Sequence, residues 1–246
     1  YEEKLNTPKV LFASFALAAV PLGLIVMQPD LSTTIVTTLI FVTLLFVAGL
    51  SYKIVAGVLS VSIPSAIILF TLLIQDKIPF IRQYQLTRIM AWLYPEDYPA
   101  DAYQQQNAIM AIGSGQLWGK GLNNTDATSV KNGNFIPEPQ TDFIFAVAGE
   151  ELGFIGTAII IILLLFVTIE CILIARKARD TAGKMICCGF AALVGFQSLV
   201  NIGVASGLLP NTGIPLPFVS YGLTSLLSLY IGVGLVLNVG LQKKKY

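Results

Sequence analysis

Six apolar runs, each about the length of a membrane-spanning helix, dominate the chain. They cover residues 10–27, 31–50, 54–74, 154–175, 185–209 and 218–241. A hydrocarbon core about 30 Å thick is crossed by roughly 20 residues at the helical rise of about 1.5 Å per residue. The sequence therefore predicts an all-α, polytopic membrane protein with about six transmembrane helices, forming a single membrane domain over residues 1–246.

The composition excludes several classes of function. Only 12% of the 246 residues are charged, against about 25% in a soluble domain, and the mean hydropathy is +0.75. A net charge of +1 predicts no nucleic-acid partner. The chain has no histidine, so any acid or base chemistry must use carboxylates. Cys171, Cys187 and Cys188 lie in apolar runs without the spacing of a zinc or disulfide site, and we expect them to be packing residues.

The basic residues between the runs predict the orientation in the membrane. They lie in the two tails, in the turn after the second run and in the turn after the fourth: Lys4, Lys9, Lys53, Arg176, Lys177, Arg179, Lys184, Lys243, Lys244 and Lys245. The turn at Asp30 and the loop 210–217 have none. Because short cytoplasmic loops are enriched in lysine and arginine, we expect both tails, including the C-terminus, to be cytoplasmic. The long segment 75–141 is then outside.

This outer segment, residues 75–141, is too long for a structureless loop in a compact protein. Leu86, Ile89, Met90 and Leu93 recur at helical spacing within it. The pattern predicts a helix that either lies in the membrane interface or packs on the outer rim of the bundle. The segment is therefore expected to be a partly helical extracytoplasmic loop.

Asp142 is the candidate catalytic residue at the end of this loop. Thr141 or Asp142 is expected to cap the following helix, whose N-terminus favours an ionised carboxylate. Asp142 can then accept a proton or hold a cation, although a role as a cap alone is the alternative. Glu138 precedes it by four residues, and Glu150 and Glu151 follow, facing the bundle interior or the interface and able to pair with a basic group.

Two other segments of the outer side carry candidate polar groups. Asp30 is expected to cap the second apolar run, on the same face as Asp142. The glycine-rich segment 113–121 contains Lys120, and its amides and this lysine can cradle a phosphate. It lacks the spacing of a Walker loop, and close packing of loop and helix is the alternative reason for its glycines.

Several short motifs follow one another along almost the whole chain. They are QPDL at 28–31, IGSGQLWGKG at 112–121, PEPQTDFIFA at 137–146, GEELG at 149–153, NIG at 201–203 and GLLPNTGIPLPFVSYG at 207–222. In sequence and order they resemble the motifs of the SEDS (shape, elongation, division and sporulation) family, which includes RodA, FtsW and SpoVE, with a general likeness to RodA. Family members have more spans than this chain, so the resemblance implies the C-terminal part of such a protein.

The resemblance implies a peptidoglycan glycosyltransferase that polymerises lipid II at the outer face of the bacterial cytoplasmic membrane, during cell elongation or division. It also implies a class B penicillin-binding protein, a transpeptidase, as partner. The essential loop aspartate of the family corresponds to Asp142, which would take the proton of an acceptor sugar hydroxyl. A divalent cation, Mg or Mn, held at Asp142 can balance the leaving diphosphate. The expected substrate-binding residues are Lys120, Arg88, Glu138, Asp30 and Ser220.

The sequence departs from the family pattern at Gln140, Ser32 and Leu223, which replace a histidine and two glycines. Gln140 cannot titrate, so no acid or base role is expected there. A lipid II flippase is the alternative function, and a structural scaffold is a third. Transport needs polar groups through the membrane midplane, where Gln197 and Asn201 are the main exceptions to an apolar sequence, so the transferase ranks first.

Overall fold

The computed structural model is a bundle of helices, with no strand in the part of the chain that it describes. It describes residues 6–28, 30–74, 83–122, 129, 133, 135–137 and 139–242. The helices are α1 (Pro8–Met27), α2 (Leu31–Val47), α3 (Tyr52–Ile74), α4 (Gln83–Leu93), α5 (Pro99–Ser114), α6 (Ile144–Arg176), α7 (Thr181–Ala205) and α8 (Leu223–Leu241). The predicted all-α class is confirmed.

Each predicted apolar run corresponds to one helix of the bundle. α1, α6, α7 and α8 are long and apolar enough to cross a membrane. α2 has 17 residues, which corresponds to about 25 Å, and α3 has 23. α6, with 33 residues, starts ten residues before its apolar run at Phe154. The chain is a polytopic α-helical membrane protein.

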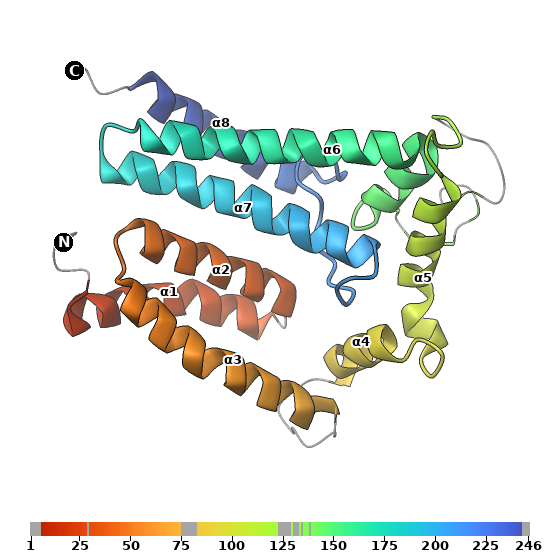
Figure 1. The fold of residues 1–246 in the computed structure, drawn as a ribbon, viewed down its shortest axis with the longest axis horizontal. Helices are drawn as coiled ribbons and strands as arrows, with labels where there is room; N and C mark the ends of the chain where they lie inside the picture. Colours follow the sequence, from red (N-terminus) through yellow and green to blue (C-terminus); the bar gives the residue numbers. More distant parts are fainter. Residues whose placement is uncertain are drawn as a thin grey trace.

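The core of the bundle lies where α6, α7 and α8 meet, with α2 against α7 and α1 against α2 (Figure 1). Leu164, Val194 and Leu229 are among its buried residues. Cys171 and Cys187 are also buried there, and the half-buried Cys188 packs against the same core, which confirms that the three are packing residues.

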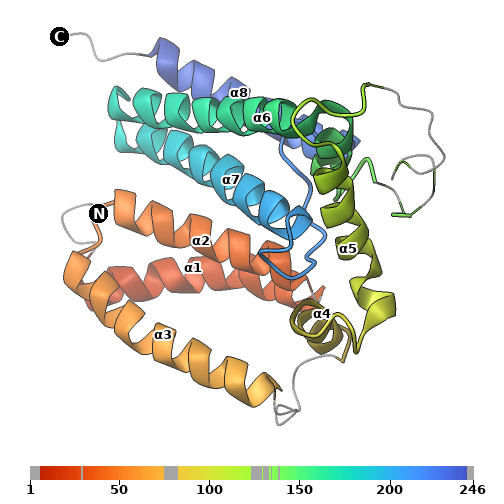
Figure 2. The same cartoon turned by 45° about the vertical axis from the view of Figure 1, so that its right-hand side comes forward.

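The turns of the bundle divide between its two ends in both views (Figures 1 and 2). The α2–α3 turn, which precedes Lys53, and the α6–α7 turn, which follows Arg176, lie at one end. α4, α5 and the loop between α7 and α8 lie at the other end, which we call the outer end. The basic turns thus share one face of the bundle, as their charge predicts.

The predicted amphipathic helix of the outer segment is present as α4, and α5 follows it across the outer end (Figure 2). The Trp92 indole on α4 donates to the carbonyl of Gly207 at 2.8 Å. On α5 the buried Gln105 amide donates to the carbonyls of Val204 at 2.8 Å and Leu209 at 2.7 Å. These contacts to the end of α7 support the alternative in which the segment packs on the rim of the bundle.

α6 is broken near the outer end at Gly153, whose φ is +66° and ψ −166°. The break interrupts the helical hydrogen bonds, and the turn after α5 takes their place. The amide of Phe154 donates to the carbonyl of Gln116 at 2.8 Å, and the amide of Ile155 to that of Leu117 at 3.2 Å. A residue with a side chain is strained at this φ, so glycine is needed at the break.

Candidate functional site

Hydrogen bonds to three successive backbone carbonyls, those of residues 140–142, hold the segment that leads into α6. They accept hydrogen bonds from the amide of Tyr221 at 2.9 Å, the hydroxyl of Ser220 at 2.6 Å and the side-chain amide of Asn201 at 2.7 Å. The donors come from α7 and from the α7–α8 loop, which are far away in sequence. The backbone of Asp142 is therefore fixed to two other parts of the bundle.

Asn201 and Ser220 are both buried, with exposed fractions of 1% and 4%. The Asn201 amide also donates to the carbonyl of Ile214 at 2.7 Å, so it joins the start of α6 to the α7–α8 loop. The Ser220 hydroxyl accepts a hydrogen bond from the amide of Leu216 at 2.7 Å. Ser220 is expected among the substrate-binding residues, and in this structure its hydroxyl is bonded to the backbone, where it helps to position the start of α6.

The prediction that Thr141 or Asp142 caps α6 is wrong. The helix starts at Ile144, its N-cap is Phe143, and no side chain of that cap bonds to the first turn. The Asp142 side chain is half-buried and lies beside the α7–α8 loop, because a Cβ placed on Gly213 would come within 3.4 Å of Asp142 Oδ2. Gly213 has a φ of +73°, which favours glycine at this position.

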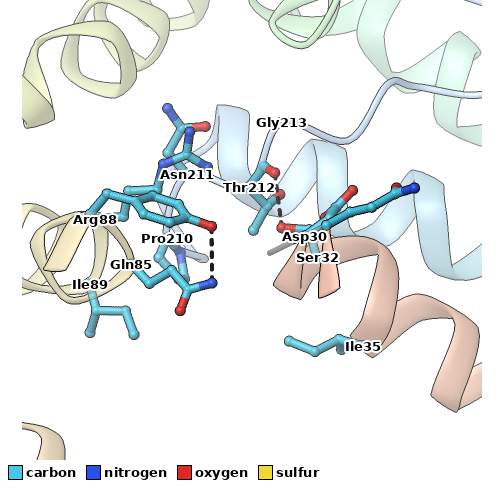
Figure 3. A pocket seen from close by; sticks show the side chains of 12 residues that line it. Asp30, Ser32, Ile35, Gln85, Arg88, Ile89, Pro210, Asn211, Thr212 and Gly213 are labelled. Atoms are coloured by element: carbon cyan, nitrogen blue, oxygen red, sulfur yellow. Dashed lines mark hydrogen bonds between the residues drawn. The ribbon is translucent and has the colours of Figure 1, made fainter. Parts of the chain in front are cut away.

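A pocket of about 400 Å³ opens at the outer end between α2, α4 and the α7–α8 loop (Figure 3). Its lining residues are Gln28, Asp30, Ser32, Ile35, Tyr84, Gln85, Arg88, Ile89, Pro210, Asn211, Thr212 and Gly213. Asp30 and Arg88, two of the expected site residues, stand on opposite walls. Gly213 belongs both to this lining and to the surroundings of Asp142. The structure thus brings Asp30 and Arg88 to one pocket, which shares Gly213 with the surroundings of Asp142.

The two charged groups of the pocket are held differently. The Arg88 guanidinium lies 5.8 Å from the centre of the Tyr84 ring, a cation–π contact that leaves its donors available to a ligand. Asp30 is the N-cap of α2 and accepts hydrogen bonds from the amide of Thr33 at 2.9 Å and from its hydroxyl at 2.6 Å. The predicted cap at Asp30 is confirmed, and the arginine is the group that can meet an anion.

Ser32, a departure from the family pattern, connects α2 to the α7–α8 loop. Its hydroxyl donates to the carbonyl of Thr212 at 2.9 Å inside the pocket (Figure 3). Asn201 holds the same loop from α7 through the carbonyl of Ile214. The stretch that contains Gly213 is therefore fixed on both sides of the glycine that faces Asp142.

Lys120, expected to bind substrate, forms an ion pair in this structure. Its ammonium lies 2.8 Å from Glu150 Oε1, and the two side chains are 28% and 3% exposed. The amides of Lys120 and Gly121 donate to the carbonyls of Glu150 and Glu151, and a Cβ on Gly119 would overlap the latter carbonyl. The close-packing alternative for this glycine-rich segment is confirmed, as is the pairing of Glu150 with a basic group.

Glu138, expected among the substrate-binding residues, is outside the residues that the structure describes. Glu170 is an exposed carboxylate within α6 that the sequence analysis does not single out. It lines a separate cavity of about 670 Å³ with Lys177, at the end of the bundle opposite to Asp142.

The described residues contain no group of three histidine, cysteine, aspartate or glutamate side chains able to hold a metal. Asp142 can supply one carboxylate to a cation. Mg²⁺ is commonly bound by one or two carboxylates together with substrate phosphates and water, so one carboxylate is compatible with an ion shared with a phosphorylated substrate.

Replacing Asn201 with alanine is expected to destabilise the protein by on the order of 2 kcal/mol, because two buried carbonyls lose their partner. Thermal unfolding of the purified protein in detergent measures the effect. Ser198→Ala is the matched control: Ser198 is also buried on α7, but its hydroxyl has no hydrogen-bond partner, so its loss should change the unfolding midpoint little. Equal midpoints for the two variants would contradict the positioning role.

The fold and the site define the class of protein, a polytopic membrane protein with an aspartate whose backbone is held at one end of its helical bundle. The family model for cell cycle proteins of the FtsW, RodA and SpoVE type matches residues 2–245. The chain belongs to this family, which confirms the resemblance found in the sequence.

Two curated relatives show the extent of the similarity. The chain is 37% identical over 233 residues to the peptidoglycan glycosyltransferase MrdB of Escherichia coli K12, covering 94% of this chain and 60% of that protein. It is 34% identical over 225 residues to the probable peptidoglycan glycosyltransferase FtsW of Escherichia coli O6:H1, covering 90% and 51%. The chain thus spans between half and two thirds of the length of these relatives.

Solved structures share the fold. A chain of a peptidoglycan synthase complex, studied for the coordination of polymerization and crosslinking, superimposes with a TM-score of 0.73 at 26% identity, covering 98% of this chain and 65% of that one. RodA of Thermus thermophilus superimposes with a TM-score of 0.56 at 26% identity, covering 100% and 62%. Both similarities extend over essentially all of the present chain.

Proposed function

We propose that this chain is part of a peptidoglycan glycosyltransferase, with Asp142 as its catalytic base. The observation that carries the proposal is the fixation of residues 140–142 by three backbone contacts, beside a pocket that holds Arg88. A base must be held within hydrogen-bond reach of the proton that it removes. The names of the relatives as peptidoglycan glycosyltransferases support the same reaction.

The reaction is an inverting transfer between two lipid-linked sugars, with lipid II as the substrate. A hydroxyl of the acceptor sugar attacks the anomeric carbon of the donor, and Asp142 takes the hydroxyl proton. The bond between that carbon and the diphosphate breaks, and the lipid diphosphate leaves with the electron pair. Arg88 faces the pocket and offers its donors to the leaving group, where stabilisation of developing charge has a large effect.

We propose that Asp142 would hold a divalent cation, Mg or Mn, when the substrate is bound. When bound it would neutralise charge on the leaving group. Among the described residues no group of three metal-binding side chains includes Asp142, which agrees with an ion that the substrate completes.

The direct test is polymerisation of lipid II by the purified full-length protein together with its partner. Glycan strands separated on a gel are the expected product. Movement of lipid II across proteoliposome membranes without any polymer would instead favour the flippase. The described core supports the transferase, because its buried residues are mostly apolar and its buried carboxylate, Glu150, is paired.

The proposed location is the bacterial cytoplasmic membrane, with the pocket at its outer face and the C-terminus in the cytoplasm. The grouping of the basic turns at the opposite end of the bundle supports this orientation. A class B penicillin-binding protein is the proposed partner, since the higher of the two TM-scores given above belongs to a chain of a peptidoglycan synthase complex that coordinates polymerization and crosslinking.

Cysteine labelling is expected to reveal this topology. A membrane-impermeant maleimide should label Asp126→Cys in intact cells, whereas Lys53→Cys and Arg176→Cys should react only after permeabilisation. Asp126 lies outside the described residues, but its side of the membrane follows from the charge pattern. The background carries alanine in place of Cys171, Cys187 and Cys188. Labelling of Lys53→Cys in intact cells would reverse the orientation.

A further inference from the structure

The turn that follows α5, residues 115–122, carries large apolar side chains that are mostly exposed. Leu117, Trp118 and Leu122 are 59%, 79% and 71% exposed. We call these three residues the turn cluster. An exposed patch of this kind marks a surface that meets an apolar partner, and the proposed pocket does not use it.

The backbone contacts of the turn fix its depth along the bundle axis. The carbonyls of Gln116 and Leu117 accept hydrogen bonds from the amides of Phe154 and Ile155 on α6. The apolar run of α6 starts at Phe154, whose own side chain is exposed. The turn therefore lies within about 3 Å, two residues of helical rise, of the level at which α6 enters the hydrocarbon. Figure 1 shows this turn at the outer end of α6.

The chemistry of the turn cluster suits that level. Tryptophan has an apolar ring and one N–H donor, and it is enriched where one end of a side chain meets lipid and the other meets water. Leu117 and Leu122 add apolar surface on either side of it in the sequence. Lys120, in the same turn, is neutralised by Glu150, so its charge does not oppose contact with lipid.

We propose that the turn cluster is a membrane anchor that inserts into the outer leaflet at the boundary between headgroups and acyl chains. Because the turn is bonded to both sides of the break at Gly153, the anchor sets the depth of the first part of α6. That part begins at Ile144, two residues after Asp142. The anchor thus fixes the height of Asp142 above the bilayer. The insertion itself does not depend on the glycosyltransferase proposal.

Tryptophan quenching in vesicles tests the insertion. The full-length protein and its Trp118→Phe variant are reconstituted into phosphatidylcholine vesicles whose acyl chains carry bromine either near the headgroup or near the chain end. The difference between the two proteins isolates the fluorescence of Trp118. We expect bromine near the headgroup to quench this difference several-fold more than bromine near the chain end, and aqueous iodide to quench it weakly.

Trp92→Phe is the matched control, because Trp92 is bonded to Gly207 on the rim and removing it should leave the Trp118 signal unchanged. Strong quenching by iodide together with none by either brominated lipid would overturn the anchor. The turn cluster would then face water when the protein is embedded in the bilayer, and it would be a surface for a protein partner. Stronger quenching from the chain end would also overturn it, since Trp118 would lie deeper than the boundary.

Discussion

Replacing Asp142 with asparagine is expected to lower the rate of glycan polymerisation by a factor of about 10² to 10⁴, the usual contribution of a positioned base. The amide has nearly the same shape as the carboxylate but cannot take the proton of the acceptor hydroxyl. The rate is measured with purified full-length protein, its partner and lipid II, by the amount of polymer formed over time.

Folding should survive this change, because the contact from Asn201 is made to the backbone carbonyl of residue 142 and not to its side chain. The unfolding midpoint of the variant therefore serves as the first control. Glu170→Gln is the second, since it removes an exposed carboxylate at the opposite end of the bundle and should leave polymerisation unchanged. Near-parent polymerisation by Asp142→Asn would refute the assignment of the base.

The features that the sequence predicts well are local ones. The apolar runs predict helices because the thickness of the bilayer fixes the length of the segment that crosses it. The cap at Asp30 depends on a contact with Thr33, which is only three positions away in the sequence. The break in α6 at Gly153 is local too, but a glycine beside an apolar run does not distinguish a break from a tolerated residue, so the sequence does not predict the break.

The features that it does not predict depend on contacts between distant residues. Asn201 and Ser220 reach backbone carbonyls 59 and 79 positions away, and a backbone carbonyl carries no mark in the sequence. The only local sign that Asn201 has a hydrogen-bond partner is its position in an apolar run, where an unpaired polar group is costly. The same reason applies to the ion pair of Lys120. The residue type predicts a positive charge, but the sequence does not show that Glu150, 30 residues later, is its partner.

Charge at the outer end predicts a requirement for a divalent cation. Asp142 and a diphosphate would bring negative charges together, and two unit charges at about 4 Å and an effective dielectric of about 20 interact by roughly 4 kcal/mol. Lys120 does not relieve this, because its ammonium is paired with Glu150. Arg88 is the cation that the described residues present to the pocket. The positive charge of one guanidinium does not balance the negative charges of both a diphosphate and a carboxylate.

Excess chelator is therefore expected to stop polymerisation, and added Mg²⁺ or Mn²⁺ to restore it, since both prefer oxygen ligands. Because the described residues hold no group of three metal-binding side chains, the ion should bind only together with the substrate. Paramagnetic resonance of Mn²⁺ checks this: binding should require lipid II and should weaken in Asp142→Asn. Full polymerisation in excess chelator would show that Arg88 and the other basic groups are sufficient, and Mn²⁺ bound tightly without lipid II would contradict an ion shared with the substrate.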